Sequence, residues 1–211
     1  GIIMAERYVI TLGRECGAGA TYIAQHLSKE LGIPYYDKDI FRMVSDKSGV
    51  LEEFFHVNSE RPGNNLLYKL VKDLKPADQK PSLGKDIVSP DNLFRFQSEL
   101  IRELADNESC IIIGRCADYV LKDHDNCVHV FVCGDMDSKV QRMMHSYSLE
   151  ESAAVERIKE TDKQRKKYYS YYTGGDWEAA SNYDLCLNTG DMSIEEAAEQ
   201  ILFYLKQKKY I

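Results

Sequence analysis

Residues 8–31 constrain the fold more than any other part of the sequence. They start with a short apolar, β-branched run at 8–12 and end with apolar residues at helical spacing over 22–31. The three glycines of the turn between them are Gly13, Gly17 and Gly19. A strand, a glycine-rich turn and a helix in this order place backbone N–H groups around an anion. We therefore expect an anion-binding turn at the start of an α/β domain; a plain tight strand-to-helix turn is the alternative.

The turn matches the phosphate-binding pattern G-x-x-x-x-G-K-S/T only in part. When Gly19 is taken as the second glycine of the pattern, Thr21 supplies the hydroxyl that pattern assigns to magnesium. Ala20 then stands at the position of the lysine, and Arg14 stands at the position of the first glycine. The loop therefore keeps the hydroxyl and lacks the lysine that normally reaches the β- and γ-phosphates.

The composition is that of an ordinary globular protein, with 44% hydrophobic and 29% charged residues among 211. This length suits one α/β domain with an insertion, or two small domains. The net charge of −7 argues against a general nucleic-acid or membrane-surface binder. No apolar run approaches 18 residues and no charged-then-apolar leader is present, so we expect a cytoplasmic protein. The six cysteines form no C-x-x-C pair, which favours buried free thiols over a metal site.

Strands and helices alternate along the rest of the chain, which predicts a parallel sheet with ligands at the carboxyl ends of its strands. The expected strands are 8–12, 35–37, 110–114, 128–133 and 183–188. The expected helices are 22–31, 40–48 (begun by Asp39 and ended by Gly49), 92–106, 136–147, 149–172 (one helix or a helical hairpin) and 194–206. Residues 51–92 show the least regular pattern, and we expect an inserted, mobile segment there, with a short helix at 66–74.

Four candidate binding groups fall at the expected carboxyl ends of the strands. The glycine turn follows the first strand, Asp37 ends the second, and Gly114-Arg115-Cys116-Ala117-Asp118 ends the third. Arg42 lies one helical turn beyond Asp37. A guanidinium gives phosphate two parallel hydrogen bonds, so Arg42 and Arg115 suit a phosphate group. Arg115 follows four buried apolar residues and needs an anionic partner; for either arginine, a structural ion pair is the alternative.

The expected helix at 149–172 is basic and ends in a basic and aromatic stretch at residues 163–172. Its cations are Arg157, Lys159, Lys163, Arg165, Lys166 and Lys167. Phosphoryl transfer asks a protein mainly for positioning and charge stabilisation, so a mobile lid carrying several cations would serve it. A solvated charged face is the equally open alternative. The tyrosines after Lys167 would pack the lid or stack on a base.

Taken together, these features resemble the cytidylate kinases, and most closely their divergent cytidylate kinase-like branch. Members of that branch carry an S-R-E-x-G-x-G turn, a G-R-C-A-D strand end and a Y-Y-x-x-Y-T-G segment. The corresponding stretches here are residues 13–19, 114–118 and 168–174. The resemblance covers almost the whole chain apart from residues 51–88.

The resemblance implies an α/β P-loop NTPase fold of the nucleoside monophosphate kinase type, with three α/β/α layers and a five-stranded parallel sheet. It implies one domain at 4–211, with a core of 4–37, 108–148 and 183–211, a helical NMP-binding insertion at about 38–107 and a lid at about 149–182. The family reaction uses ATP and Mg²⁺ to phosphorylate CMP or dCMP. The only partners expected are such small-molecule nucleotides, with no nucleic acid and no membrane.

The resemblance also assigns site residues by position. The ATP phosphates would be held by Gly13, Cys16, Gly17, Ala18, Gly19, Ala20 and Thr21, with Thr21 at the metal. The acceptor nucleotide would be held by Asp37, Arg42, Arg115 and Asp118. Arg115, Arg157 and Arg165 would act in catalysis together with Arg14, which we hypothesise replaces the charge of the absent lysine. No general base is needed, because the acceptor phosphate is already an oxyanion.

Two departures from the family pattern keep other functions open. Ordinary cytidylate kinases have the P-loop lysine and a G-R-D strand end, where this chain has Ala20 and Gly114-Arg115-Cys116. Thr161 and Asp162 also differ from the Arg-Asp pair of the ordinary family lid. The alternatives are a catalytically weak nucleotide- or phosphate-binding protein on the same fold, and a kinase of another small-molecule acceptor.

Overall fold

The computed structural model describes residues 6–50, 52–57, 78–82 and 87–211. Within them, five strands form one parallel sheet in the order β2-β3-β1-β4-β5. The strands are β1 (Val9–Arg14), β2 (Tyr35–Tyr36), β3 (Cys110–Ile113), β4 (Cys127–Cys133) and β5 (Leu185–Asn188). The central strands read as nearly continuous apolar runs because both faces of the sheet are covered by helices.

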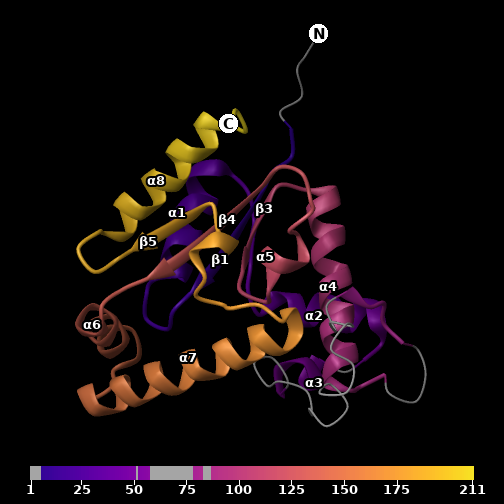
Figure 1. Cartoon of the computed structure of the whole chain (residues 1–211), viewed down its shortest axis with the longest axis horizontal. Helices are drawn as coiled ribbons and strands as arrows, with labels where there is room; N and C mark the ends of the chain where they lie inside the picture. The colour runs from indigo at the N-terminus through magenta and orange to yellow at the C-terminus, as the bar shows by residue number, and fades with distance from the viewer. Residues whose placement is uncertain (1–5, 51, 58–77, 83–86) are drawn as a thin grey trace.

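Each face of the sheet packs against its own set of helices (Figure 1). Alternate residues of one strand serve different faces, as Ile10 and Leu12 do on one side and Val9 does on the other. The first face holds α1 (Ala20–Leu31) and α8 (Ile194–Gln207), whose N-terminus carries a capping box at Ser193 and Glu196. The second face holds α2 (Asp39–Ser48), α3 (Glu52–Val57), α4 (Pro90–Asn107) and α5 (Ala117–Val120). This is the three-layer α/β/α arrangement expected from the sequence.

Two further helices lie at the edge and end of the sheet. α6 (Met136–Tyr147) follows β4, and α7 (Glu151–Thr173) runs from α6 to the α2–α4 side, as the orange helix of Figure 1 shows. The N-terminal half of α7 buries Ala154 and Ile158 against α6 and Cys16. Its C-terminal half buries four tyrosines, of which Tyr172 stacks on Phe94 of α4 at 4.0 Å between ring centroids. α7 is therefore packed at both ends, unlike a free-standing lid.

Most elements lie within two residues of their expected bounds, and the differences have local causes. Gly49 ends α2 in the left-handed conformation (φ 71°), as expected. The expectation that Asp39 caps this helix is wrong, because Asp39 is its first residue and Lys38 is the N-cap. Residues 149–172 form one helix, not a hairpin. The short helices α3 and α5 were not expected, and the predicted helix at 66–74 lies outside the described residues.

The cysteines are free thiols, as expected, although not all are buried. Cys16, Cys110 and Cys116 are buried, whereas Cys186 is exposed on the edge strand β5. The general expectation of buried thiols is therefore wrong for Cys186, because β5 is an edge strand and an edge strand is covered less completely than a central one. Among the described residues, no helix is long and apolar enough to cross a membrane.

Candidate functional site

A cavity of about 510 Å³ lies at the carboxyl end of β1, between the glycine turn, α6 and α7. This volume falls in the range of small-molecule sites. Its lining comes from five parts of the chain that are distant in sequence. The lining residues are Arg14, Glu15, Cys16, Gly17, Gly19, Ala20, Thr21, Tyr22, Gln25, Asp37, Lys38, Arg115, Arg142, Met143, Ser146, Tyr147, Arg157, Thr161 and Arg165.

The turn from β1 into α1 forms the floor of this cavity. Gly17 and Gly19 have φ of 80° and 91°, and a Cβ on Gly19 would come within 2.5 Å of the Ile194 side chain. The positive φ of Gly19 favours glycine there, and a larger residue would also displace the Ile194 side chain. Within the described part of the chain, the amides of Gly17, Gly19, Ala20 and Thr21 donate no hydrogen bond. Four such amides at a helix N-terminus form an electropositive cradle for an anion.

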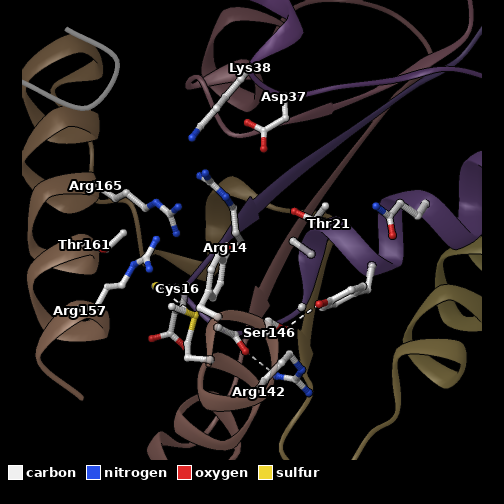
Figure 2. A pocket seen from close by; sticks show the side chains of 18 of the residues that line it. Arg14, Cys16, Thr21, Asp37, Lys38, Arg142, Ser146, Arg157, Thr161 and Arg165 are labelled. Carbon is white, nitrogen blue, oxygen red and sulfur yellow. Dashed lines mark hydrogen bonds between the residues drawn. The ribbon is translucent and has the colours of Figure 1, made fainter. Parts of the chain in front are cut away.

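Three arginines from three elements meet beside this cradle. Arg14 comes from the end of β1, Arg115 from the turn after β3 and Arg165 from α7. All three also line a second, small cavity of about 30 Å³ next to the first. Figure 2 shows Arg14, Arg157 and Arg165 extending toward one another across the main cavity. Several guanidiniums that line one cavity make it electropositive, so this arrangement suits a phosphate group.

The turn after β3 places Arg115 through an unusual backbone conformation. Gly114, Arg115 and Cys116 all have positive φ, at 66°, 59° and 53°. Non-glycine residues rarely adopt this conformation, and such strain concentrates at functional sites. A Cβ on Gly114 would lie 2.5 Å from Arg14 Nη1, so this glycine lets the Arg14 guanidinium pass close to the backbone.

The Arg115 side chain is almost completely buried, with 4% exposed. Its Nη2 donates to Asp37 Oδ1 at 3.3 Å, and its guanidinium lies 4.3 Å from the centre of the Phe41 ring. Asp37 is thus the anionic partner that the sequence analysis predicts for Arg115. Asp37 and the Phe41 ring hold the Arg115 guanidinium in place, where it lines the cavity.

Asp118 follows on α5 and is buried, lining the small cavity and not the main one. Its Oδ2 accepts a hydrogen bond from the Tyr169 hydroxyl of α7 at 2.7 Å. Burial raises the pKa of Asp118 from its ordinary value of 3.8 to about 6, against the lowering effect of the Tyr169 hydroxyl. Asp118 is therefore a candidate functional group, because it is a buried carboxyl with a raised pKa that lines the same small cavity as three arginines.

One face of α7 supplies the wall opposite the turn. Arg157, Thr161 and Arg165 are four residues apart and so lie in one row. Figure 2 shows this row pointing into the cavity. The Arg157 guanidinium also lies 4.5 Å from the centre of the Tyr147 ring, at the end of α6. The basic stretch is therefore not only a solvated face, because part of it lines the site.

The structure brings most of the predicted residues together in the main cavity. It holds Arg14, Cys16, Gly17, Gly19, Ala20, Thr21, Asp37, Arg115, Arg157 and Arg165. Gly13 lies within β1 and lines the small cavity, because the strand extends two residues further than expected. Ala18 is buried, and its carbonyl accepts from the Thr189 hydroxyl. Arg42 does not join the others: it is exposed on α2, and the described cavities do not include it.

Several lining residues were missed by reasoning from the sequence. Arg142 of α6 donates to the Gly17 carbonyl at 2.6 Å and covers Gly19. Tyr22 of α1 exchanges a hydrogen bond of 2.7 Å with Ser146 of α6 across one edge of the cavity. Lys38 follows Asp37 directly and could have been found by its position alone. The α6 residues carry no motif, and only their helical spacing could have indicated a shared face.

The residues present fit Mg²⁺ bound together with a nucleotide. Mg²⁺ usually takes one or two protein oxygens and completes its shell with phosphates and water. Thr21 offers an exposed hydroxyl next to the amide cradle, and within the described chain this hydroxyl makes no hydrogen bond. Glu15 and Asp37 also line this cavity.

Comparisons with known proteins agree with this arrangement. The model of the cytidylate kinase-like family matches residues 9–191. A cytidylate kinase of Methanobrevibacter smithii is 24% identical over 94% of this chain and 98% of its own length. The cytidylate kinase of Methanopyrus kandleri is 26% identical, over 89% and 88%.

Solved structures show the same fold. An uncharacterized protein from Eubacterium ventriosum superimposes with a TM-score of 0.70 at 26% identity, over 95% of this chain and 99% of that one. A shikimate kinase from Bacteroides thetaiotaomicron superimposes with a TM-score of 0.53 at 14% identity, over 94% and 98%. The chain thus has the P-loop fold of the nucleoside monophosphate kinase type, as expected from the sequence.

Proposed function

Because the chain belongs to the cytidylate kinase-like family, we propose that it is a phosphotransferase that moves the γ-phosphoryl group of ATP to a nucleoside monophosphate, with CMP and dCMP as first candidates. One observation carries the proposal. Four amides that make no hydrogen bond to the described residues of the protein, and the guanidiniums of Arg14, Arg115 and Arg165, face one cavity. Such a set is suited to two phosphate groups that must approach each other despite their charge.

The proposed roles follow from the positions of these groups. The amides of the turn would bind the donor phosphates, and the Thr21 hydroxyl would hold the Mg²⁺ that accompanies them. Arg115, held by Asp37, would orient the acceptor phosphate. An acceptor oxygen would form the new bond to the γ-phosphorus while the bond to the bridging oxygen breaks, so that ADP leaves with the electron pair. Arg14 and Arg165 would neutralise the charge that spreads over the transferred group.

Arg14 is the proposed replacement for the absent P-loop lysine. It lies in the turn itself and reaches over Gly114 toward the Arg115 side of the site. A guanidinium there can serve the transferred phosphoryl group as an ammonium does in the ordinary loop, although with planar, bidentate geometry. Ala20, which is buried, leaves no cation at the usual position.

The test is a coupled ADP-release assay with MgATP and CMP, dCMP, UMP, AMP or no acceptor. We expect turnover that depends on the acceptor and is fastest with CMP or dCMP. Arg165→Ala should lower kcat/KM by about 100-fold, the scale of one lost charge-stabilising donor. Arg7→Ala is the matched control, because this exposed arginine precedes β1 at the opposite end of the strand. Equal activity of both variants would point to a contaminating kinase and refute the assignment.

A second candidate is a nucleotide-binding protein with little catalysis, which the alanine at the lysine position favours. It predicts ATP or CMP binding by calorimetry without acceptor-dependent ADP release. A kinase of another small molecule predicts ATP binding without CMP binding. The acceptor panel and calorimetry together therefore separate the three functions.

A further inference from the structure

The phosphate turn is tied to α7 by one carboxylate. The backbone amide of Cys16, in the turn between β1 and α1, donates a hydrogen bond to Asp162 Oδ1 of α7 at 2.7 Å. The two residues are 146 positions apart in the chain. The Cys16 amide therefore differs from those of Gly17, Gly19, Ala20 and Thr21, because its hydrogen bond is already made within the protein.

Asp162 belongs to a small, partly buried cluster of charges beneath the turn. The Lys139 ammonium of α6 lies 3.3 Å from Glu15 Oε2 and 3.8 Å from Asp162 Oδ2. Only 6% of the Lys139 side chain is exposed, and the other Glu15 oxygen accepts from the Gly134 amide at 3.0 Å. Burial raises the pKa of Asp162, although the Cys16 amide and Lys139 oppose the rise. The cluster thus links three elements: the turn, α6 and α7.

The position of Asp162 on α7 explains what this link can do. The buried anchors of α7 are Ile158 and residues before it, and Tyr168 and residues after it, so residues 159–167 have no buried side chain. Asp162 lies in the middle of this stretch. It lies next to Thr161 and three residues before Arg165, which line the cavity (Figure 2). A shift or rotation of the middle of α7 would move the arginine row relative to the turn.

We propose that Asp162 is a positioning residue that sets the arginine row of α7 against the phosphate turn, and that it thereby determines how strongly the terminal phosphate of a bound nucleoside triphosphate is held. This inference rests on the proposed function and refines it. Asp162 does not line the cavity and contacts no expected ligand position. It acts through Cys16 on one side and through Arg157 and Arg165 on the other.

The test compares Asp162→Ala, which removes the acceptor, with Asp162→Asn, which keeps an oxygen for the Cys16 amide. Glu160→Ala is the control, because this exposed carboxylate of the same helix accepts a hydrogen bond from Gln164 and lies away from the turn. Lys139 keeps Glu15 as its ion partner in each variant, so no variant leaves an unpaired buried ammonium. Thermal melts check that all three fold.

The readout is binding of ADP and of a non-hydrolysable ATP analogue, measured by calorimetry with Mg²⁺. For Asp162→Ala we expect the analogue affinity to fall about tenfold while the ADP affinity changes less than about twofold, since only the analogue has the phosphate that the arginines hold. Asp162→Asn should recover most of the difference, and Glu160→Ala should match the wild type.

Equal losses of ADP and analogue binding in Asp162→Ala would show a merely structural contact and overturn the proposal, as would no loss at all. The binding assay needs no acceptor. If the wild-type protein binds both nucleotides but turns over no acceptor, the proposed kinase activity fails while the role of Asp162 is still decided.

Discussion

Replacing Asp118 by asparagine should make the protein more stable near neutral pH. Asp118 is buried, and its pKa is raised from 3.8 to about 6 in the folded state. Above pH 6 the folded protein must therefore keep a charge where the environment favours the neutral acid. Asparagine has nearly the same shape, carries no charge and still offers an oxygen to the Tyr169 hydroxyl.

The size and sign of the effect follow from the linkage of protonation to folding. A pKa of about 6 in the folded state and 3.8 in the unfolded chain differ by about two, and each unit is worth 1.36 kcal/mol, which gives about 3 kcal/mol. Because the folded pKa is the higher, the stability lent by the protonated carboxyl is fully present below pH 3.8. It is lost as the pH rises to about 6.

The assay is urea unfolding of the wild-type protein and of Asp118→Asn between pH 4 and pH 8. The stability difference should be near zero at pH 4 and should favour the variant by about 2–3 kcal/mol at pH 7.5. The exposed Asp123 provides the control: the difference in stability between Asp123→Asn and the wild type should be the same across this pH range. A difference for Asp118→Asn that does not change with pH would refute the reasoning, because burial of the charge would then not be its cause.

Three further perturbations test the site and the packing. Arg14→Ala should lower kcat about 100-fold, with Arg14→Lys in between, if Arg14 replaces the missing lysine; unchanged turnover and ATP affinity in the coupled assay would contradict this. Gly114→Ala should lower activity at least about tenfold and stability by about 1 kcal/mol, because its φ of 66° is strained for alanine and the methyl group would displace the Arg14 guanidinium. Tyr172→Ala should cost about 3–5 kcal/mol in urea unfolding, since it empties a fully buried ring site stacked on Phe94; a cost below 1 kcal/mol would show that α7 is not anchored by its aromatic end.

Much of the site could be predicted from the sequence because it is attached to strand ends. The strand, turn and helix of residues 8–31 follow from local periodicity and glycine placement, and the structure agrees over nearly the whole stretch. Asp37 directly follows β2 and Arg115 lies two residues beyond the end of β3, and these two strands are neighbours in the sheet. Parallel strands bring their carboxyl ends to one edge, so residues attached there meet whatever the helices do. The roles assigned to these residues remain predictions.

Residues on helices were harder to place, because the direction of a helical side chain depends on how the helix packs. Arg42 lies one turn from Asp37 in the sequence, yet α2 buries Phe41 and Val44 and leaves Arg42 exposed. Arg142 and Ser146 carry no motif and were missed, although α6 places both in the cavity. The predicted lid contains α7, which has buried residues at both ends because its tyrosines belong to the core; its role as a lid stays a prediction.

The sequence by itself determined the α/β class, the order of the elements and the glycine-rich turn between β1 and α1, because these depend on periodicity and on residues close along the chain. The tertiary structure alone decided which distant groups meet. Asp118 accepts a hydrogen bond from the Tyr169 hydroxyl, 51 positions away in the sequence. Asp162 accepts one from the Cys16 amide, 146 positions away. Such contacts arise from the packing of α7 against the rest of the domain. Local sequence sets only the residues available to make them.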